Sequence, residues 1–171
     1  MTKILFLDFD GVLNWAKCRW RWDGTTNRRL AEGEIGGMFG IDPEKVALVN
    51  DIIVKTGCIV VISSTWRLSD DWADAIRQAG FDTAHARGVT PHLPRSGGRE
   101  ARERGHEIAA WFKDCLKHGV EFNEGSTFAI LDDDSDMLES QMPHFFQTRW
   151  DTGLTREIAD RVITHLNTPA V

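Results

Sequence analysis

Two aspartates near the start of the chain, Asp8 and Asp10, have the type and spacing that phosphoryl chemistry and metal binding require. They follow the apolar residues 4–7 directly, and Gly11 comes next. A short apolar run of this kind predicts a parallel strand buried on both faces. Because residues two apart on an extended chain point to the same side, we expect both carboxylates to lie together while Phe9 faces the core. Two carboxylates this close repel each other, and a divalent cation with oxygen ligands relieves that repulsion.

Two later apolar runs also end in polar residues. Residues 58–62 lead into Ser63 and Ser64, and residues 127–131 lead into Asp132 and Asp133. The carboxyl ends of parallel strands form the edge at which an open α/β sheet binds its ligands. The sequence therefore predicts one site that combines the acids and hydroxyls of three strand ends.

The segment Asp8 to Val12, DFDGV, resembles the first motif of the haloacid dehalogenase (HAD) superfamily. Nearly the whole chain is similar to the HAD-type domains of nucleic-acid repair proteins. The segments that carry this resemblance are FLDFDGVLN, ISSTWR, the Thr90-Pro91 pair, RGHEI, LDDDSDM and GLT at Gly153 to Thr155.

The resemblance implies a role for each acid at the strand ends. Asp8 would be the phosphoryl-accepting nucleophile, and Asp10 the acid and base. It implies a Mg²⁺ ion held by Asp8, the Asp10 backbone carbonyl and Asp132, with Asp133 as a second-sphere or water-mediated ligand. Asp136 is an alternative ligand, and the spacing does not decide which acid of the later strand touches the metal.

The resemblance also implies phosphate-binding groups. Ser63 and Ser64 match the second motif, in which a hydroxyl donates to a phosphoryl oxygen. Arg67 resembles an arginine of the phosphatase domain of bacteriophage polynucleotide kinase that contacts substrate phosphate. Arg104 stands where the superfamily normally has a lysine, which is a departure because the two cations are not interchangeable. Three other cations compete for that place: Arg99, Arg102 and Lys113.

The elements that must position these residues alternate between strands and helices. Helix signals follow Asp42, Ser69, Glu100 and Thr155, and weaker strands are expected at Phe81 to His85 and Phe145 to Thr148. The core face of the helix from about Glu100 to His118 is expected at Ile108, Phe112 and Cys115. The pattern predicts an α/β fold with a doubly wound, mostly parallel sheet. The resemblance implies that the Ile4 strand is central and flanked by the Ile59 and Phe128 strands.

The length of 171 residues suits one domain spanning 1–171. Within it, residues 14–40 are rich in Trp, Arg and Gly and have no clean period. We expect them to form a small cap-like insertion at the mouth of the site. Its alternating aromatic and basic residues can stack a base and hold a phosphate, and a short strand pair whose tryptophans only cover the sheet is an equal alternative.

The formal charge of −6 argues against broad binding to a nucleic-acid backbone. No apolar stretch is long enough to span a bilayer and no signal-peptide pattern precedes the first strand, so the expected location is cytoplasmic and no membrane partner is expected. The cysteines, Cys18, Cys58 and Cys115, form no CxxC pair and are expected to be buried thiols.

Taken together, the residues predict a Mg²⁺-dependent phosphomonoester hydrolase that forms an aspartyl-phosphate. Its substrate would be a phosphorylated small molecule such as a nucleotide, or a nucleic-acid end. Two alternatives are a receiver-like phospho-acceptor without fast turnover and a catalytically weak nucleic-acid-binding module. The sequence leaves the oligomeric state open.

Overall fold

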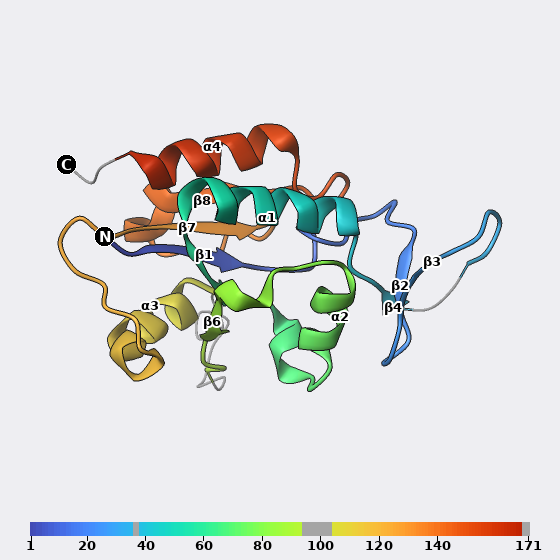
Figure 1. Cartoon of the computed structure of the whole chain (residues 1–171), viewed down its shortest axis with the longest axis horizontal. Helices are drawn as coiled ribbons and strands as arrows, with labels where there is room; N and C mark the ends of the chain where they lie inside the picture. Colours follow the sequence, from blue (N-terminus) through green and yellow to red (C-terminus); the bar gives the residue numbers. More distant parts are fainter. Residues whose placement is uncertain (36–37, 94–103, 169–171) are drawn as a thin grey trace.

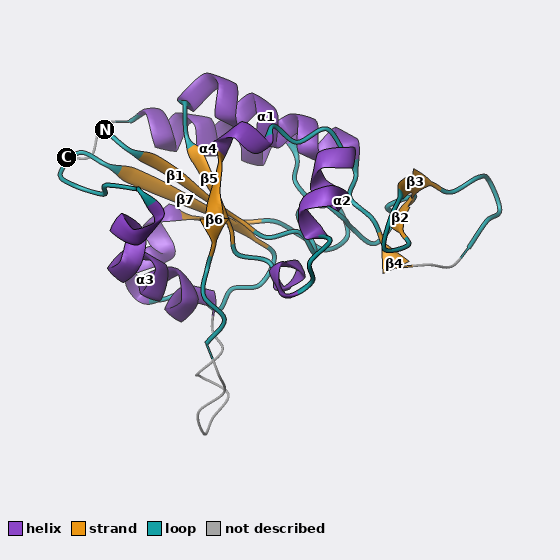
Figure 2. Cartoon of the chain, turned by 60° about the horizontal axis from the view of Figure 1, so that its bottom comes forward, coloured by secondary structure: helices purple, strands orange, loops and turns teal. Residues whose placement is uncertain are grey.

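A five-stranded parallel sheet forms the centre of the protein, seen here in a computed structural model that describes residues 1–35, 38–93 and 104–168 (Figures 1 and 2). The strand order is β6-β5-β1-β7-β8. The strands are β1 (Lys3–Leu7), β5 (Ile59–Ile62), β6 (Ala86–Val89), β7 (Thr127–Asp132) and β8 (Phe145–Gln147). The predicted fold class is confirmed, and so is the central place of β1 between β5 and β7.

Helices cover both faces of this sheet. They are α1 (Pro43–Thr56), α2 (Trp72–Gln78), α3 (Arg104–Asp114) and α4 (Arg156–Asn167). The side chains of β1 alternate between two cores: Leu5 and Leu7 pack with α1, α2 and α4, whereas Ile4 and Phe6 pack with α3. This burial on both faces explains why β1 is apolar without interruption.

The helix ends follow the predicted capping chemistry. The Asp42 side chain accepts a hydrogen bond from the Glu44 amide at the start of α1, and Gly57 ends that helix in the left-handed conformation at φ 68°. Thr155 caps α4 through the amide of Ile158, at 3.3 Å. None of the helices in the described part of the chain has the length and hydropathy of a membrane span.

Two predicted elements differ from the structure. The expected strand at Phe81 to His85 is wrong, because the Asp82 side chain accepts from the Ala84 amide and caps a 3₁₀ turn over Thr83–His85; the strand β6 follows that turn. The helix expected from about Glu100 to His118 ends as an α-helix at Asp114 and continues as the 3₁₀ turn Cys115–His118. Its predicted start lies outside the described residues.

The core face of α3 also differs in one position. Ile108 and Cys115 are buried as expected, but Trp111 is fully buried while Phe112 is only partly so. All three cysteines are free and buried, as predicted.

Residues 14–40 contain a second, three-stranded antiparallel sheet of order β3-β2-β4, with β2 (Trp20–Trp22), β3 (Asn27–Arg29) and β4 (Met38–Phe39). Figure 1 shows it beyond the carboxyl end of β1. The Gln78 side chain of α2 joins the two parts: its oxygen accepts from the Asn27 amide and its nitrogen donates to the Thr25 carbonyl. The small sheet is thus held at the end of the main sheet where ligands bind in this class of fold.

Candidate active site

The register of the main sheet brings the three predicted strand ends together. Leu7 pairs with Ile62 on one side and with Leu131 on the other. One residue further on, the Asp8 amide donates to the Leu131 carbonyl at 3.0 Å and the Ser63 amide donates to the Leu7 carbonyl at 2.9 Å. Asp8, Ser63 and Asp132 therefore leave the sheet at the same edge and the same level.

Three carboxylates cluster at this edge. One oxygen each of Asp8, Asp132 and Asp133 lie within 4.8 Å of one another. Asp8 is 4% exposed and Asp132 is 1% exposed, whereas Asp133 is half-buried. Oxygens this close together from three acids form a donor set of the kind that hard divalent cations take.

Burial dominates the electrostatics of the cluster. It raises the pKa of Asp8, which the charge of Asp10 raises further while Arg104 and the Ser64 side chain oppose the rise. Burial and the neighbouring Asp8 charge likewise raise the pKa of Asp132. Burial is also the main cause of the raised pKa of Asp133. Without a bound cation, Asp8 and Asp132 are therefore expected to keep their protons to a higher pH than an ordinary aspartate does.

Asp10 lies beside the cluster with its carboxylate held by two groups. Its Oδ1 accepts from the Asn14 amide at 2.7 Å and from the Trp66 indole at 3.1 Å. Its Oδ2 has no hydrogen-bond partner among the described residues. Sequence reasoning missed both Asn14 and Trp66, although each lies inside a segment that carries the family resemblance.

Arg104 binds several groups of the site at once. Its Nη2 lies 3.3 Å from Asp8 and its Nε lies 3.1 Å from Asp132. Its Nη1 donates to the Ser63 carbonyl and lies 3.4 Å from Glu107. The structure thus places Arg104 against the predicted nucleophile. The competitor Lys113 is exposed on α3, and Arg99 and Arg102 lie outside the described residues.

Arg67 differs from Arg104, because every N–H group of its guanidinium already donates a hydrogen bond within the protein. Nε donates to the Thr90 carbonyl, Nη1 to the carbonyls of Ser63 and Ser64, and Nη2 to the Pro91 carbonyl and to Glu107. These contacts use all five N–H groups that an arginine has. The Arg67 side chain is 2% exposed. Its hydrogen bonds connect the end of β5 to the end of β6, and in this conformation it has no donor left for a substrate.

Glu107 is the acid that sequence reasoning missed altogether. It is 4% exposed and lies 2.6 Å from Arg67 and 3.4 Å from Arg104. It follows Arg104 by three residues, the spacing at which helix side chains meet, so the signal was present in the RGHEI segment. Glu107 joins the two arginines into one buried network.

The predicted residues Ser63, Ser64 and Asp136 differ in their hydrogen bonds. Ser63 is fully buried and its hydroxyl has no hydrogen-bond partner in the described structure, whereas Ser64 caps the following 3₁₀ turn and hydrogen-bonds to Asp8. Asp136 caps α3 by accepting from the Arg104 amide at 2.8 Å and is not part of the carboxylate cluster. An orphan hydroxyl is costly when buried, so a ligand oxygen at Ser63 would stabilise the site.

Gly11 allows the close approach of Asp133. Its φ is 69°, and a Cβ at this position would lie 2.1 Å from the Asp133 Cγ. The glycine of the DFDG segment is thus required both by its backbone conformation and by the space that Asp133 occupies.

The parallel sheet with acids at the ends of β1 and β7 is the arrangement of the HAD superfamily. A match among solved structures is the HAD domain of the effector protein Lem4 from Legionella pneumophila, with a TM-score of 0.55 and 14% identity over 97% of this chain and 96% of that chain. At this identity the likeness shows the fold alone.

A family model described as the HAD domain in Swiss Army Knife RNA repair proteins matches residues 4–159. The chain belongs to this family. The resemblance to the HAD superfamily is thereby confirmed. A search of the curated proteins found no match.

Proposed function

We propose that the protein is a Mg²⁺-dependent phosphomonoester hydrolase that forms an aspartyl-phosphate on Asp8. The observation that carries this proposal is the buried cluster of Asp8, Asp132 and Asp133, whose oxygens lie within 4.8 Å of one another beside Arg104. A solvated acidic loop would not bury its carboxylates or place a guanidinium against them.

The residues fit a hard divalent cation. The three clustered carboxylate oxygens are of the kind that Mg²⁺ prefers, and the Asp10 backbone carbonyl would be a fourth oxygen ligand. The raised pKa of Asp8 and of Asp132 supports this, because it means that the protein alone does not offset the negative charge of the cluster. When bound there, Mg²⁺ would offset the repulsion between an anionic nucleophile and an anionic phosphate.

The side chains then have separate tasks. An Asp8 oxygen forms a bond to phosphorus as the ester P–O bond breaks, and Asp10 gives a proton to the leaving alcohol oxygen. A water molecule next attacks the aspartyl-phosphate while Asp10 takes a proton from it, which releases inorganic phosphate and restores Asp8. The unpartnered Oδ2 of Asp10 supports this role.

Arg104 and Ser63 would bind and orient the phosphoryl group. Arg104 lies 3.3 Å from Asp8, so its charge falls on the atoms that react. The unpartnered Ser63 hydroxyl supports a hydrogen bond to a phosphoryl oxygen. Arg67 would act differently from the sequence expectation, by positioning the Ser63 loop through its carbonyl contacts.

The proposed substrate is a nucleotide or the terminal phosphate of a nucleic acid. The family's occurrence in RNA repair proteins supports this class. The small sheet of residues 14–40, beyond the end of β1, provides additional surface for a substrate larger than a sugar phosphate.

Phosphate release from an aryl phosphate, with Mg²⁺ or with chelator, tests the activity. A panel of nucleotides, sugar phosphates and oligonucleotides with 3′- or 5′-phosphates then tests the substrate. We expect Asp8→Asn to reduce turnover by at least about a thousandfold, as removal of a nucleophile does. Asp70→Asn, on an exposed acid, is the matched control. An Asp8→Asn protein as active as the parent would remove Asp8 from its role, and a long-lived phosphoprotein without turnover would favour the receiver-like alternative.

A further inference from the structure

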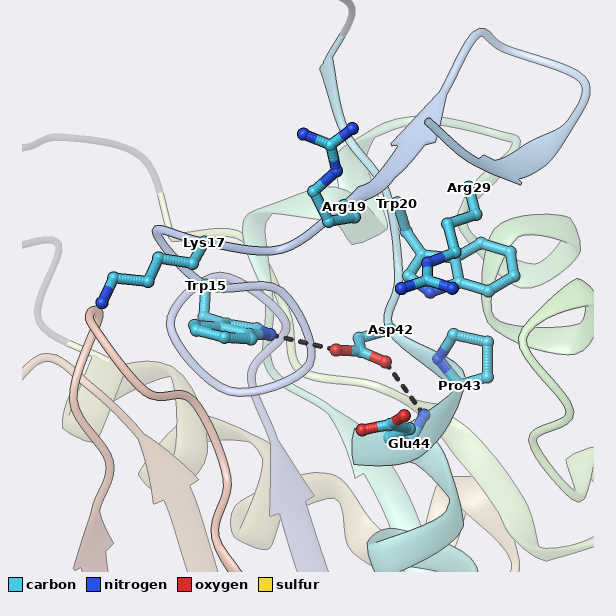
Figure 3. Close-up of a pocket in the computed structure, with 8 residues that line it drawn as sticks. All are labelled: Trp15, Lys17, Arg19, Trp20, Arg29, Asp42, Pro43 and Glu44. Carbon is cyan, nitrogen blue, oxygen red and sulfur yellow. Dashed lines mark hydrogen bonds between the residues drawn. The ribbon is translucent and has the colours of Figure 1, made fainter. Parts of the chain in front are cut away.

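A concave site lies on the insertion, and the carboxylates of the cluster are not among the residues that line it. It is a cavity of about 200 Å³ between the small sheet and the start of α1 (Figure 3). It is lined by two tryptophans, three cations, two acids and a proline: Trp15, Trp20, Lys17, Arg19, Arg29, Asp42, Glu44 and Pro43. The volume is below that of pockets for drug-sized ligands and is suited to a single ring system.

Neighbouring side chains hold the Trp15 ring in place at the edge of the cavity. The Trp15 indole donates to Asp42 at 3.0 Å, and the Lys45 ammonium lies 5.2 Å from the centre of its ring. Trp20 is half-buried and pairs across the small sheet with Arg29. Figure 3 shows Trp15 on one side of the cavity, with Trp20 and Arg29 together on the other. The ring of Trp15, held in this way, is a surface on which a planar base stacks with little loss of side-chain freedom, and the half-buried ring of Trp20 provides a second aromatic surface.

The side chains that line the cavity include three cations and two acids. Asp42 is 7% exposed, and both its oxygens accept hydrogen bonds, from Trp15 and from the Glu44 amide. Among the described residues, no hydrogen bond or ion pair engages the side chains of Lys17 and Arg29. Two unpaired cations beside aromatic rings match the alternation of base and phosphate in a single strand.

The other basic and aromatic residues of the insertion have structural contacts instead. Trp22 is 2% exposed and donates to Asp71 at 2.6 Å. Arg21 lies over the Phe39 ring at 4.6 Å and donates to the Trp20 carbonyl at 2.7 Å. Of the tryptophans in the insertion that we expected to stack bases, Trp15 and Trp20 therefore line the cavity and Trp22 does not.

The chain connects this cavity to the catalytic acids. Trp15 directly follows Asn14, whose amide holds Asp10 at 2.7 Å. We propose that the cavity binds an unpaired base of a single-stranded nucleic acid, with Lys17 and Arg29 on its flanking phosphates. This inference rests on the proposed function, because it supplies the substrate class for the Asp8 centre.

The test is the binding of a fluorescein-labelled single-stranded RNA of about ten nucleotides that carries no terminal phosphate, measured by anisotropy in chelator. Loss of the stacking ring in Trp20→Ala should weaken binding about 5- to 150-fold. Arg29→Ala should weaken it and lower the slope of log affinity against log salt by about 0.7, the contribution of one phosphate contact. Glu44→Gln removes the opposing charge and should tighten binding, a gain that misfolding cannot produce.

Two controls match these changes in size and charge. Arg28→Ala removes the neighbouring exposed arginine of β3, which pairs with Glu34, and Trp150→Ala removes an exposed tryptophan that packs on Phe39. Both should bind RNA as the parent does. Equal binding of a blunt duplex of the same sequence would overturn the inference, because paired bases are already stacked.

Phosphate release from the aryl phosphate, measured separately, distinguishes the two proposals. If the parent is active but Trp20→Ala and Arg29→Ala bind RNA like the parent, the inference fails and the proposed function stands. If the binding pattern is found in a protein without phosphatase activity, the inference stands as a nucleic-acid-binding site and the proposed function fails.

Discussion

Replacing Asp8, the proposed nucleophile, should make the metal-free protein more stable at alkaline pH. Asp8 is 4% exposed, and burial raises its pKa to about 7. In an unfolded chain an aspartate has a pKa of about 3.9. Folding is therefore linked to proton uptake at Asp8. The contribution of Asp8 to the free energy of unfolding is fully present below about pH 4 and is lost as the pH rises from there to the folded-state pKa.

The size of the effect follows from the shift. A shift of about three units corresponds to roughly 4 kcal/mol, and because Asp132 titrates with Asp8 we expect about 2 to 4 kcal/mol at pH 8. Asparagine has the shape of the neutral acid and does not titrate. Asp8→Asn should thus exceed the parent in unfolding free energy by about 2 to 4 kcal/mol at pH 8, and by about 1.5 kcal/mol at pH 5.

Urea unfolding in chelator, followed by tryptophan fluorescence and circular dichroism at both pH values, measures the difference. Asp70→Asn, an exposed acid, should stay within about 0.5 kcal/mol of the parent. A gain for Asp8→Asn that is absent at pH 8, or is the same at both pH values, would refute the electrostatic reasoning. A stabilised but inactive variant would also show that lost activity comes from chemistry rather than misfolding.

Three further outcomes follow from the same site. Mg²⁺ at about a hundred times its pH 8 dissociation constant should stabilise the parent at pH 8 by about 2.7 kcal/mol. The same concentration should stabilise it less at pH 5, because protons compete for the carboxylates, and Mg²⁺ binding should release protons that calorimetry in two buffers detects. Glu107→Gln leaves Arg67 and Arg104 under-compensated, so it should lower the unfolding free energy by about 3 kcal/mol and reduce kcat, both measurable on one preparation. Gly11→Ala should lower both stability and activity, since its Cβ would lie 2.1 Å from the Asp133 Cγ and its φ of 69° disfavours side chains; denaturation and phosphate release check this.

The strand ends could be predicted because the signal is local. Apolar runs that stop at an acid or a hydroxyl identify parallel strands, and parallel neighbours align their carboxyl ends. Asp8, Ser63 and Asp132 therefore meet wherever β5, β1 and β7 are adjacent. The family resemblance supplied the strand order.

The partners of these residues could not be predicted in the same way. Glu107 contacts Arg67, which is 40 residues away in sequence, and the Trp66 indole reaches Asp10 across 56 residues. Such contacts depend on side-chain direction and on the exact docking of α3, which no local pattern encodes. In the insertion, Trp20 and Trp22 share one face of β2, yet Asp71 and the core cover only Trp22.

The charges at the sheet edge connect the arginines with the proposed metal. Four carboxylates, those of Asp8, Asp132, Asp133 and Glu107, lie in a network with only two guanidiniums, those of Arg67 and Arg104. Fully ionised, this set has an excess of two negative charges, and the neighbouring carboxylate of Asp10 adds a third, so one divalent cation would offset most of the excess. The fork of Arg104 reaches Asp8 and Asp132 together, which the single ammonium of a lysine would match less well. Without a cation the excess is relieved by protons, as the raised pKa of Asp8 and of Asp132 indicates. A bound cation would take the place of these protons, so we expect metal binding at this edge of the sheet to release them.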